Sequence, residues 1–279
     1  MQIETILSPA ELPLVARRDL RETACVVFDI LRATSTFVTA LQNGAEKIIP
    51  VGEICEAVAL KNKFPGLLLA GERDGVKICA VQSGGIDFDL GNSPREFTPE
   101  KIRGQTIVST TTNGTRALRA CAKAKTVLAA SFLNLAATAK FLEQQNFNKI
   151  MLICAGTGDG VADEDVLAAG AMVDLLAGRD EQNAALNHPA CGIAPGIRAR
   201  TAQRAIPTTI STSSEFARRS FQSIASDLYL AMTKATNGTR LQSNPDLRGD
   251  VVFCAQRDIY DLVVVMDAEG ALRVVASSN

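Results

Sequence analysis

Residues 108–118 read Val-Ser-Thr-Thr-Thr-Asn-Gly-Thr-Arg-Ala-Leu and predict the end of a strand, a polar turn and the start of a helix. An apolar run ends at Val108, four hydroxyl residues follow it, and Asn113-Gly114 is typical of a tight turn. Backbone N–H groups at a helix start, hydroxyl groups and a guanidinium together can cradle a phosphate or another oxyanion. The alternative is a plain turn whose threonine side chains cap the helix.

The composition indicates a globular protein with a sizeable core. The chain has 279 residues, 47% of them hydrophobic, and a formal net charge of -1. Without a long basic run or a basic, aromatic-rich strip, nucleic acid is not expected as a partner. The N-terminus does not resemble a signal peptide and no apolar segment is long enough to span a membrane, so we expect a cytoplasmic protein with no membrane partner.

The cysteine and histidine content limits the kinds of catalytic and metal site that this chain can contain. The seven cysteines are scattered and include no Cys-x-x-Cys pair, so neither disulfides nor a structural zinc site is expected. His188 is the only histidine, which excludes most histidine-based acid–base schemes and multi-histidine metal sites. Any chemistry therefore rests on carboxylates, hydroxyl groups and arginines.

Two further predicted strands end in polar residues. Residues 24–28 predict a strand buried on both faces, followed by Asp29, Arg32 and a helix that ends at Gly44. Residues 149–154 predict another strand, then a glycine-rich turn and an acidic helix start with Asp163, Glu164 and Asp165. Ligands bind outside the carboxyl ends of parallel strands, so we expect Asp29, Arg32 and one of these three acids to face a site. The alternatives are that Asp29 caps its helix, that Arg32 is solvated and that the acids only favour the helix dipole.

The remaining pattern predicts an α/β protein: a layered α/β/α arrangement with a mostly parallel, mixed sheet and two lobes around a cleft. We treat residues 1–279 as one domain, with any boundary between lobes near residue 178. In the strand at 47–51, Pro50 indicates an edge or terminal place in the sheet. The other predicted strands are residues 67–70, 125–130, 251–255, 262–266 and 272–276. The other predicted helices are residues 53–63 and 133–145, and residues 215–234 predict one or two more.

Several short motifs resemble known binding-site signatures but do not match them. The glycine-rich turn at 155–160 is neither a dinucleotide fingerprint nor a P-loop. Asp87 and Asp89 lie in a long polar loop with no buried strand before them, so they match a haloacid-dehalogenase-type pair only weakly. In the same loop, Asn92 and Ser93 are either ligand donors or an Asx turn. The pentapeptide Thr-Asn-Gly-Thr-Arg occurs at 112–116 and again at 236–240, and we interpret the second copy as a turn.

Six blocks, in order along the chain, resemble the 2-phosphosulfolactate phosphatase family. The resemblance covers about residues 24–177, and the last hundred residues match only loosely. It implies a magnesium-dependent phosphomonoesterase that converts 2-phosphosulfolactate to 3-sulfolactate for coenzyme M biosynthesis. Asp74, where a glycine is expected, and Ala162-Asp163, where Ser-Leu is more usual, depart from the family pattern. The blocks are Phe-Asp-Ile-Leu-Arg-Ala-Thr-Ser-Thr (28–36), Ala-Gly-Glu-Arg (70–73), Asp-Leu-Gly-Asn-Ser-Pro (89–94), Thr-Thr-Thr-Asn-Gly-Thr-Arg (110–116), Cys-Ala-Gly-Thr (154–157) and Glu-Asp-Val-Leu (164–167).

This resemblance leads to a hypothesis for the site. Asp29 and Glu72 are the leading Mg2+ ligands, and Glu164 or Asp165 is a further ligand or the general base. Arg32 and Arg73 pair with the carboxylate and sulfonate of a small, anionic phosphorylated substrate. Asn92 and Ser93 are further substrate donors, and the phosphate is held by Thr112, Asn113, Gly114, Thr115 and Arg116.

Other interpretations stay open at this point. The enzyme can act on another small phosphorylated hydroxy acid, or the chain can be a non-catalytic module that binds a phosphorylated metabolite and regulates a partner. We favour attack by activated water over a phosphoaspartate on Asp29. The sequence also leaves open a homo-oligomer and the roles of Cys154, Ser131 and Asn134.

Overall fold

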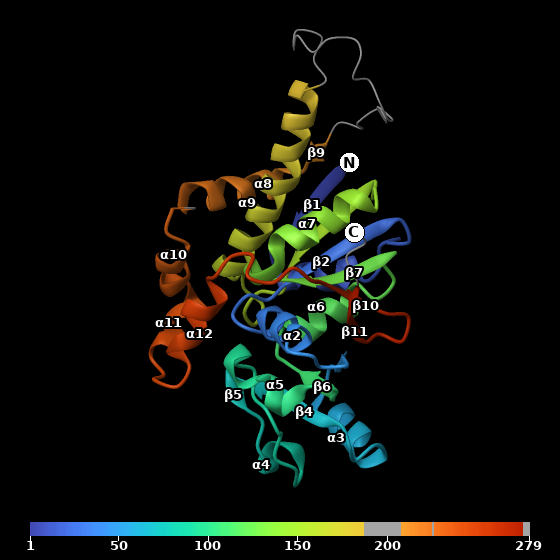
Figure 1. The fold of residues 1–279 in the computed structure, drawn as a ribbon, viewed down its shortest axis with the longest axis vertical. Coiled ribbons are helices and arrows are strands. Elements are labelled where there is room, and N and C mark those ends of the chain that lie inside the picture. The colour runs from blue at the N-terminus through green and yellow to red at the C-terminus, as the bar shows by residue number, and fades with distance from the viewer. Residues whose placement is uncertain (187–207, 225, 276–279) are drawn as a thin grey trace.

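The computed structural model describes residues 1–186, 208–224 and 226–275, and in these residues it shows one large mixed sheet flanked by helices (Figure 1). Along the sheet the strand order is β5-β4-β6-β3-β11-β10-β7-β2-β8-β1-β9. The strands are β1 (Gln2–Ile6), β2 (Thr23–Phe28), β3 (Lys47–Pro50), β4 (Leu68–Arg73), β5 (Val76–Lys77), β6 (Thr106–Thr110), β7 (Thr126–Ala130), β8 (Lys149–Cys154), β9 (Thr209–Ile210), β10 (Val263–Met266) and β11 (Leu272–Val275).

The sheet consists of two parallel blocks joined by an antiparallel hairpin. One block contains β4, β6 and β3, and the other contains β7, β2, β8, β1 and β9. Strands β10 and β11 form the hairpin, which pairs antiparallel with β7 on one side and with β3 on the other. The mostly parallel, mixed sheet predicted from the sequence is therefore confirmed.

Helices connect the parallel strands, because a parallel pair needs a crossover. The described helices are α1 (Leu12–Val15), α2 (Ala33–Gln42), α3 (Ile54–Lys63), α4 (Ala80–Ser83), α5 (Pro99–Ile102), α6 (Gly114–Ala120), α7 (Leu135–Gln144), α8 (Asp163–Leu186), α9 (Thr212–Ile224), α10 (Leu228–Lys234), α11 (Thr236–Gln242) and α12 (Arg248–Cys254), with short 3-10 turns η1 (Pro9–Glu11), η2 (Pro94–Glu96) and η3 (Phe132–Asn134). Figure 1 shows α10, α11 and α12 together at one side of the sheet.

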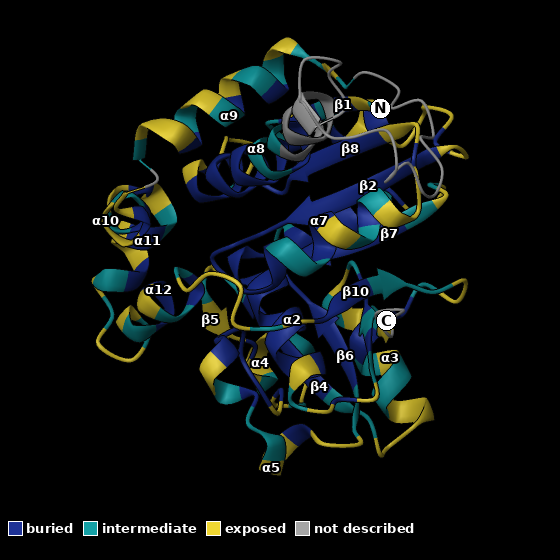
Figure 2. Ribbon diagram, turned by 45° about the horizontal axis from the view of Figure 1, so that its top comes forward, coloured by how far each residue is buried: buried dark blue, intermediate teal, exposed yellow. Residues whose placement is uncertain are grey.

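The two faces of β2 contribute to two different cores. Side chains alternate across a strand, so Val26 and Phe28 pack with residues of α7 and α8, whereas Cys25 and Val27 pack with residues of α2 and α6. Every residue of β2 is buried, and Figure 2 shows the central strands enclosed between helices whose outer faces are exposed. The layered α/β/α architecture follows from this arrangement.

The sequence prediction was wrong at two segments near the C-terminus. Residues 251–255 are apolar and suggested a strand, but they belong to α12 and its C-cap, where Val251 and Cys254 are buried and Val252 is exposed. This three-residue spacing is helical. The second Thr-Asn-Gly-Thr-Arg copy is not a turn, because it opens α11. In α11, a Cβ atom on Gly238 would lie 1.7 Å from the carbonyl oxygen of Met232, so only glycine permits this contact with α10.

Two smaller corrections concern the block that contains β3, β4 and β6. Strand β3 is not at an edge, since it lies between β6 and β11, but it pairs with β11 only through Ile48 and Leu272. Pro50 is the last residue of β3 and lies beyond that pair, so its missing N–H costs no bond there. Strand β4 continues through Glu72 and Arg73, three residues beyond the end of the strand predicted at 67–70.

The remaining predicted elements are confirmed to within a few residues at their ends. His188, and Ala276 at the end of the last predicted strand, lie outside the described residues. A search of the described helices finds none with both the length and the apolar character needed to cross a membrane.

We predict opposite effects for two glycine-to-alanine changes in α8. At Gly170 an added Cβ would lie 2.0 Å from the carbonyl oxygen of Ala217 on α9, so Gly170→Ala should destabilise the fold by about 1–3 kcal/mol. At Gly178 no atom lies within 4 Å of an added Cβ, so Gly178→Ala should be neutral or add up to about 1 kcal/mol through helix propensity. Urea unfolding of both variants measures the difference, and equal unfolding midpoints would contradict the α8–α9 contact.

Candidate active site

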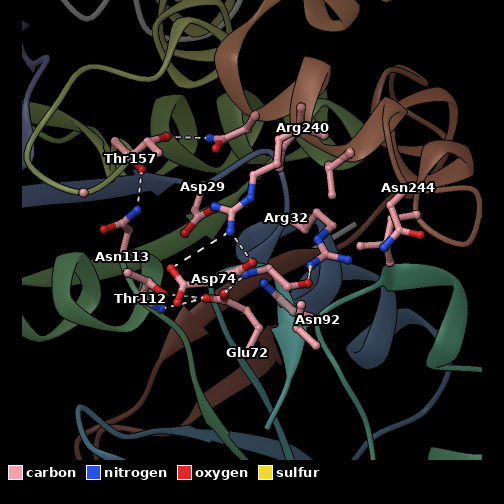
Figure 3. Close-up of a pocket in the computed structure, with 18 of the residues that line it drawn as sticks. Asp29, Arg32, Glu72, Asp74, Asn92, Thr112, Asn113, Thr157, Arg240 and Asn244 are labelled. Atoms are coloured by element: carbon pink, nitrogen blue, oxygen red, sulfur yellow. Dashed lines mark hydrogen bonds and ion pairs between the residues drawn. The ribbon is translucent and has the colours of Figure 1, made fainter.

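The structure contains a pocket of about 500 Å³ where the carboxyl ends of the two parallel blocks meet (Figure 3). One wall comes from the segments after β2 and β8, another from β4, the β4–β5 turn and the segment after β6, and a third from α11 and the residues that follow it. The lining residues are Asp29, Leu31, Arg32, Glu72, Asp74, Gly75, Val76, Asn92, Thr112, Asn113, Gly156, Thr157, Gly158, Asn237, Arg240, Leu241, Ser243, Asn244 and Leu247.

Asp29 lies at the centre of a group of buried carboxylates. Its Oδ1 accepts a hydrogen bond from the backbone N–H of Ala33, the first residue of α2, at 3.2 Å. A Cβ atom on Gly114 would lie only 2.7 Å from Oδ2 of Asp29, so the glycine leaves room for this carboxylate. Burial raises the pKa of Asp29 to about 7, and the negative charges of Glu72 and Glu164 add to the effect.

Glu72 ties two turns of the pocket together. Its Oε1 accepts from the backbone N–H of Thr112 at 2.8 Å and from the hydroxyl of Thr112 at 3.0 Å. Its Oε2 accepts from the backbone N–H of Gly75 at 2.7 Å. Glu72 therefore fixes the segment after β6 against the β4–β5 turn while its side chain lines the pocket.

Asp165 lies beneath the pocket and joins the ends of β2 and β8. Its Oδ1 accepts from the backbone N–H of Ile30 at 2.8 Å, and its Oδ2 accepts from the backbone N–H of Gly156 at 3.0 Å. The side chain is buried, and burial together with the charges of Asp29 and Glu164 raises its pKa well above the usual range. Both oxygen atoms are engaged, so Asp165 holds the two strand-end segments in place.

Glu164 differs from Asp165 in having one unpaired oxygen. Its Oε1 accepts from the amide of Asn237 at 2.6 Å, whereas its buried Oε2 has no hydrogen-bond partner among the described residues. The Oδ1 of Asn113 is also buried and unpaired. Burial raises the pKa of Glu164 and the bond from Asn237 opposes the shift. Two oxygen acceptors without donors are costly in a protein interior, so they indicate room for a bound group.

Two asparagines hold the turn after β8 from opposite walls. Asn113 donates through Nδ2 to the carbonyl oxygen of Gly156 at 2.7 Å. Asn237 donates through Nδ2 to the hydroxyl of Thr157 at 2.6 Å as well as to Glu164. Figure 3 shows Asn113 beside the turn that carries Thr157. Both asparagines belong to copies of the Thr-Asn-Gly-Thr-Arg pentapeptide.

Arg32 lines the pocket and is anchored by a buried ion pair. Its Nη1 donates to Oδ2 of Asp250 at 2.9 Å, and its Nη2 donates to the carbonyl oxygen of Gly75 at 2.8 Å. Asp250 is fully buried in α12 and also accepts from the hydroxyl of Ser93 at 2.6 Å and from Nε of Arg95 at 2.9 Å. Asp250 thus connects α12 to Arg32 and to the loop before η2.

The other two arginines of the sequence hypothesis are not among the lining residues. Arg73 donates to the carbonyl oxygen of Glu72 at 2.7 Å, to the hydroxyl of Thr110 at 3.0 Å and to the carbonyl oxygen of Gly52 at 3.4 Å. These bonds hold the end of β4 against β6. Arg116 is exposed on α6.

The polar residues of the hypothesis divide in the same way. Asn92, Thr112 and Asn113 line the pocket, whereas Ser93 and Thr115 are buried outside it. The hydroxyl of Thr115 donates to the carbonyl oxygen of Thr111 at 3.0 Å, so part of the hydroxyl cluster caps α6. The capping interpretation therefore holds for Thr115, whereas Thr112 and Asn113 face the pocket.

Ser131 and Asn134, whose roles the sequence left open, organise the η3 turn and not the pocket. Asn134 accepts from the backbone N–H of Ser131 at 3.0 Å and donates to the carbonyl oxygen of Leu262 at 3.1 Å, next to β10. Burial raises the pKa of Cys154 well above its usual range, which makes its thiol a poor nucleophile.

The sequence reasoning missed Asn237, Arg240 and Asp250. The repeated pentapeptide was a usable signal for the first two, because the first copy had already been placed at the site. Nothing in the sequence marks Asp250 as a site residue, because a lone acid before an apolar run is common on protein surfaces.

The donor set suits a hard cation. The acceptor atoms around Asp29 are oxygens of carboxylates, hydroxyl groups and amides, and hard cations such as Mg2+ prefer oxygen ligands. The described residues contain no group of three or more His, Cys, Asp or Glu side chains already arranged as a metal site. One or two carboxylates with water and substrate oxygens are enough for Mg2+, so the unpaired oxygens of Glu164 and Asn113 and the pocket-lining carboxylate of Asp29 fit such an ion.

We predict that Asp29→Asn changes the pH dependence of stability in metal-free buffer. The folded pKa of Asp29, about 7, lies above the usual 3.8, so the stability that its proton contributes is present below about pH 4 and lost as the pH rises through 7. Asparagine does not titrate. The Tm of Asp29→Asn minus that of the wild type should therefore increase from about pH 5 to about pH 8, on the order of 5 °C.

Asp163→Asn is the matched control, because Asp163 is an exposed carboxylate in the same acidic helix start as Glu164. An exposed side chain keeps nearly the same surroundings on unfolding, so the Tm difference between Asp163→Asn and the wild type should stay flat from about pH 5 to about pH 8. A flat difference for Asp29→Asn as well would contradict the raised pKa.

Comparisons with known proteins match most of this chain to one family. The profile described as 2-phosphosulpholactate phosphatase matches residues 11–269. A protein of Caldanaerobacter subterraneus subsp. tengcongensis named probable 2-phosphosulfolactate phosphatase is 46% identical over 161 residues, 57% of this chain and 64% of the relative. Proteins of the same name are 48% identical in Thermotoga petrophila, over 56% of this chain and 63% of the relative, and 41% identical in Carboxydothermus hydrogenoformans, over 63% and 68%.

Two of these three alignments cover less than two thirds of the relative's length. The family profile extends further and includes the segment that carries Asn237, Arg240 and Asp250. It confirms the resemblance indicated by the sequence blocks between residues 24 and 177. The chain therefore belongs to the 2-phosphosulpholactate phosphatase family.

Proposed function

We propose that this protein is a magnesium-dependent phosphomonoesterase that hydrolyses 2-phosphosulfolactate to 3-sulfolactate and phosphate. The names of its relatives support the substrate. The observation that carries the proposal is the group of buried carboxylates around Asp29, at the floor of a pocket that also presents Arg32 and Arg240. Carboxylates repel an anionic substrate unless a cation lies between them, so this site suits a metal and a phosphate together.

The ion would be held by Asp29 and Glu72, the two carboxylates at the pocket floor, with the unpaired oxygen of Asn113 as a neutral ligand. When bound, Mg2+ would neutralise charge on the phosphoryl oxygens and polarise the phosphorus for attack. Glu72 keeps its two backbone bonds in this arrangement, because Oε2 accepts only the bond from Gly75 and has a second lone pair for the ion.

The protein's own side chains would bind and orient the phosphate. Thr112 and Asn113 lie at the start of α6, where the first backbone N–H groups have no acceptor within the helix, and they face the pocket. Asp165 keeps the ends of β2 and β8 fixed through two backbone N–H bonds, so the position of Asp29 does not depend on substrate. This preorganisation lowers the cost of aligning the reacting groups.

Glu164 is the group that we assign to proton transfer. Its unpaired Oε2 can accept a proton from the attacking water, and burial raises its pKa, which makes it a stronger base. The water oxygen bonds to phosphorus as the P–O ester bond breaks, and the leaving alkoxide takes up the proton that Glu164 accepted. Asn237 orients Glu164 through the bond to Oε1.

A substrate panel tests the reaction, the metal and the substrate together. Phosphate release is measured from 2-phosphosulfolactate, 2-phospholactate, phosphoglycolate and an aryl phosphate, each with Mg2+ and with EDTA. We expect turnover that requires Mg2+ and strongly prefers the sulfonated substrate. Similar turnover of the other phosphates would contradict the assignment of 2-phosphosulfolactate as the substrate. Binding without turnover of any compound would contradict the assignment of an enzymatic function.

Removing either proposed ligand carboxylate should abolish most of the activity. Asp29→Asn and Glu72→Gln are each expected to lower kcat by at least about 100-fold, because the charge that holds the ion is lost. Asp87→Asn is the matched control, since Asp87 is exposed and accepts a bond from Ala80 outside the pocket, and it should retain wild-type kcat. Circular dichroism verifies folding. A loss of only a few-fold in well-folded Asp29→Asn and Glu72→Gln would argue against the metal assignment.

A further inference from the structure

The second copy of the pentapeptide places an arginine in the pocket that the first copy does not. Arg240 projects from α11 into the pocket, as Figure 3 shows, and its side chain is half exposed. Its Nη2 donates to the carbonyl oxygen of Asp74 and lies 4.0 Å from Oδ1 of the same residue. The Asp74 side chain is 96% exposed, so its charge offsets that of Arg240 only weakly.

Arg240 and Arg32 converge on one turn. The guanidinium carbon of Arg240 and Nη2 of Arg32 both lie 3.9 Å from the position that a Cβ atom of Gly75 would occupy. The charge of Arg32 is balanced by Asp250, whereas in the described part of the chain Arg240 pairs with no buried carboxylate. Two guanidinium groups beside one turn make this side of the pocket positive, which attracts the anionic groups of a ligand.

The two arginines differ in depth. Arg32 is buried, lines the pocket and follows Asp29 by three residues after β2, so it lies near the end of the pocket that we assign to the phosphoryl group. Arg240 is half exposed and bonds to the outer turn between β4 and β5. A ligand that fills the pocket therefore presents its phosphorylated carbon near Arg32 and its far end near Arg240.

We infer that Arg240 is the specificity-determining residue that binds the sulfonate of the substrate, while Arg32 takes the carboxylate next to the phosphate ester. This inference rests on the proposed function and replaces Arg73, whose guanidinium is engaged by β4 and β6, with Arg240. A planar guanidinium with several N–H donors suits a sulfonate, which offers three acceptor oxygens.

The test compares Arg240→Met and Arg240→Lys with the wild type on three substrates. 2-Phosphosulfolactate carries both a sulfonate and a carboxylate, 2-phospholactate carries only the carboxylate, and an aryl phosphate carries neither. For Arg240→Met, kcat/KM on 2-phosphosulfolactate should fall by about 10- to 100-fold, mainly through KM. On the other two substrates the change should stay below about threefold. Arg240→Lys should recover part of the loss.

Arg219→Met is the control, because Arg219 is an exposed arginine of α9 that pairs with Glu215 and should leave all three values unchanged. An equal loss on all three substrates would overturn the inference and assign Arg240 to the phosphoryl group. No loss on any substrate would overturn it as well.

Binding of 3-sulfolactate, measured by calorimetry, separates this inference from the proposed function. The wild type should bind it, and Arg240→Met should bind it about 10- to 100-fold more weakly. If the wild type hydrolyses none of the phosphates but shows this difference, the reaction is wrong and the sulfonate subsite stands. Equal affinity of the two proteins for 3-sulfolactate refutes the subsite whether or not the enzyme is active.

Discussion

The burial of several carboxylates at one point is the constraint on which the site depends. Asp29, Glu72, Glu164 and Asp165 are all at least nine-tenths buried, and taking such groups out of water is costly unless hydrogen bonds or cations compensate. Hydrogen bonds reach both oxygens of Glu72 and both oxygens of Asp165, so these two acids hold the segments around the pocket in place. Asp29 and Glu164 are compensated only in part, and a cation at Asp29 and Glu72 would supply the missing positive charge.

The sheet topology brings these acids together. Two parallel blocks joined in a simple parallel sheet would place all their carboxyl ends along one edge. Here the antiparallel hairpin of β10 and β11 separates the blocks, and the ends of β2 and β8 face the ends of β4 and β6 across a pocket. The C-terminal part of the chain therefore supplies both the hairpin that links the blocks and, through α11, the third wall.

This division explains what could be predicted from the sequence. Asp29, Thr112 and Asn113 follow apolar runs, and a strand end in a parallel sheet is a reliable indicator of a ligand site. Arg73 and Arg116 follow the same kind of run, yet one binds backbone carbonyls and the other is exposed, because local pattern does not determine the direction of a long side chain. Asn237 and Arg240 depend on long-range packing of short helices, which leaves no periodic signal in seven residues.

The two pentapeptides show how context assigns roles to identical residues. In the first copy Gly114 makes room for Asp29, and in the second Gly238 makes room for a carbonyl oxygen of α10, so each glycine allows a different close contact. Each asparagine then reaches the same turn after β8 from its own wall. The helices approach that turn from different directions, so Arg116 ends in solvent while Arg240 ends in the pocket. A repeated sequence can thus supply equivalent asparagine contacts and only one arginine, which suits a substrate whose two ends carry different charges.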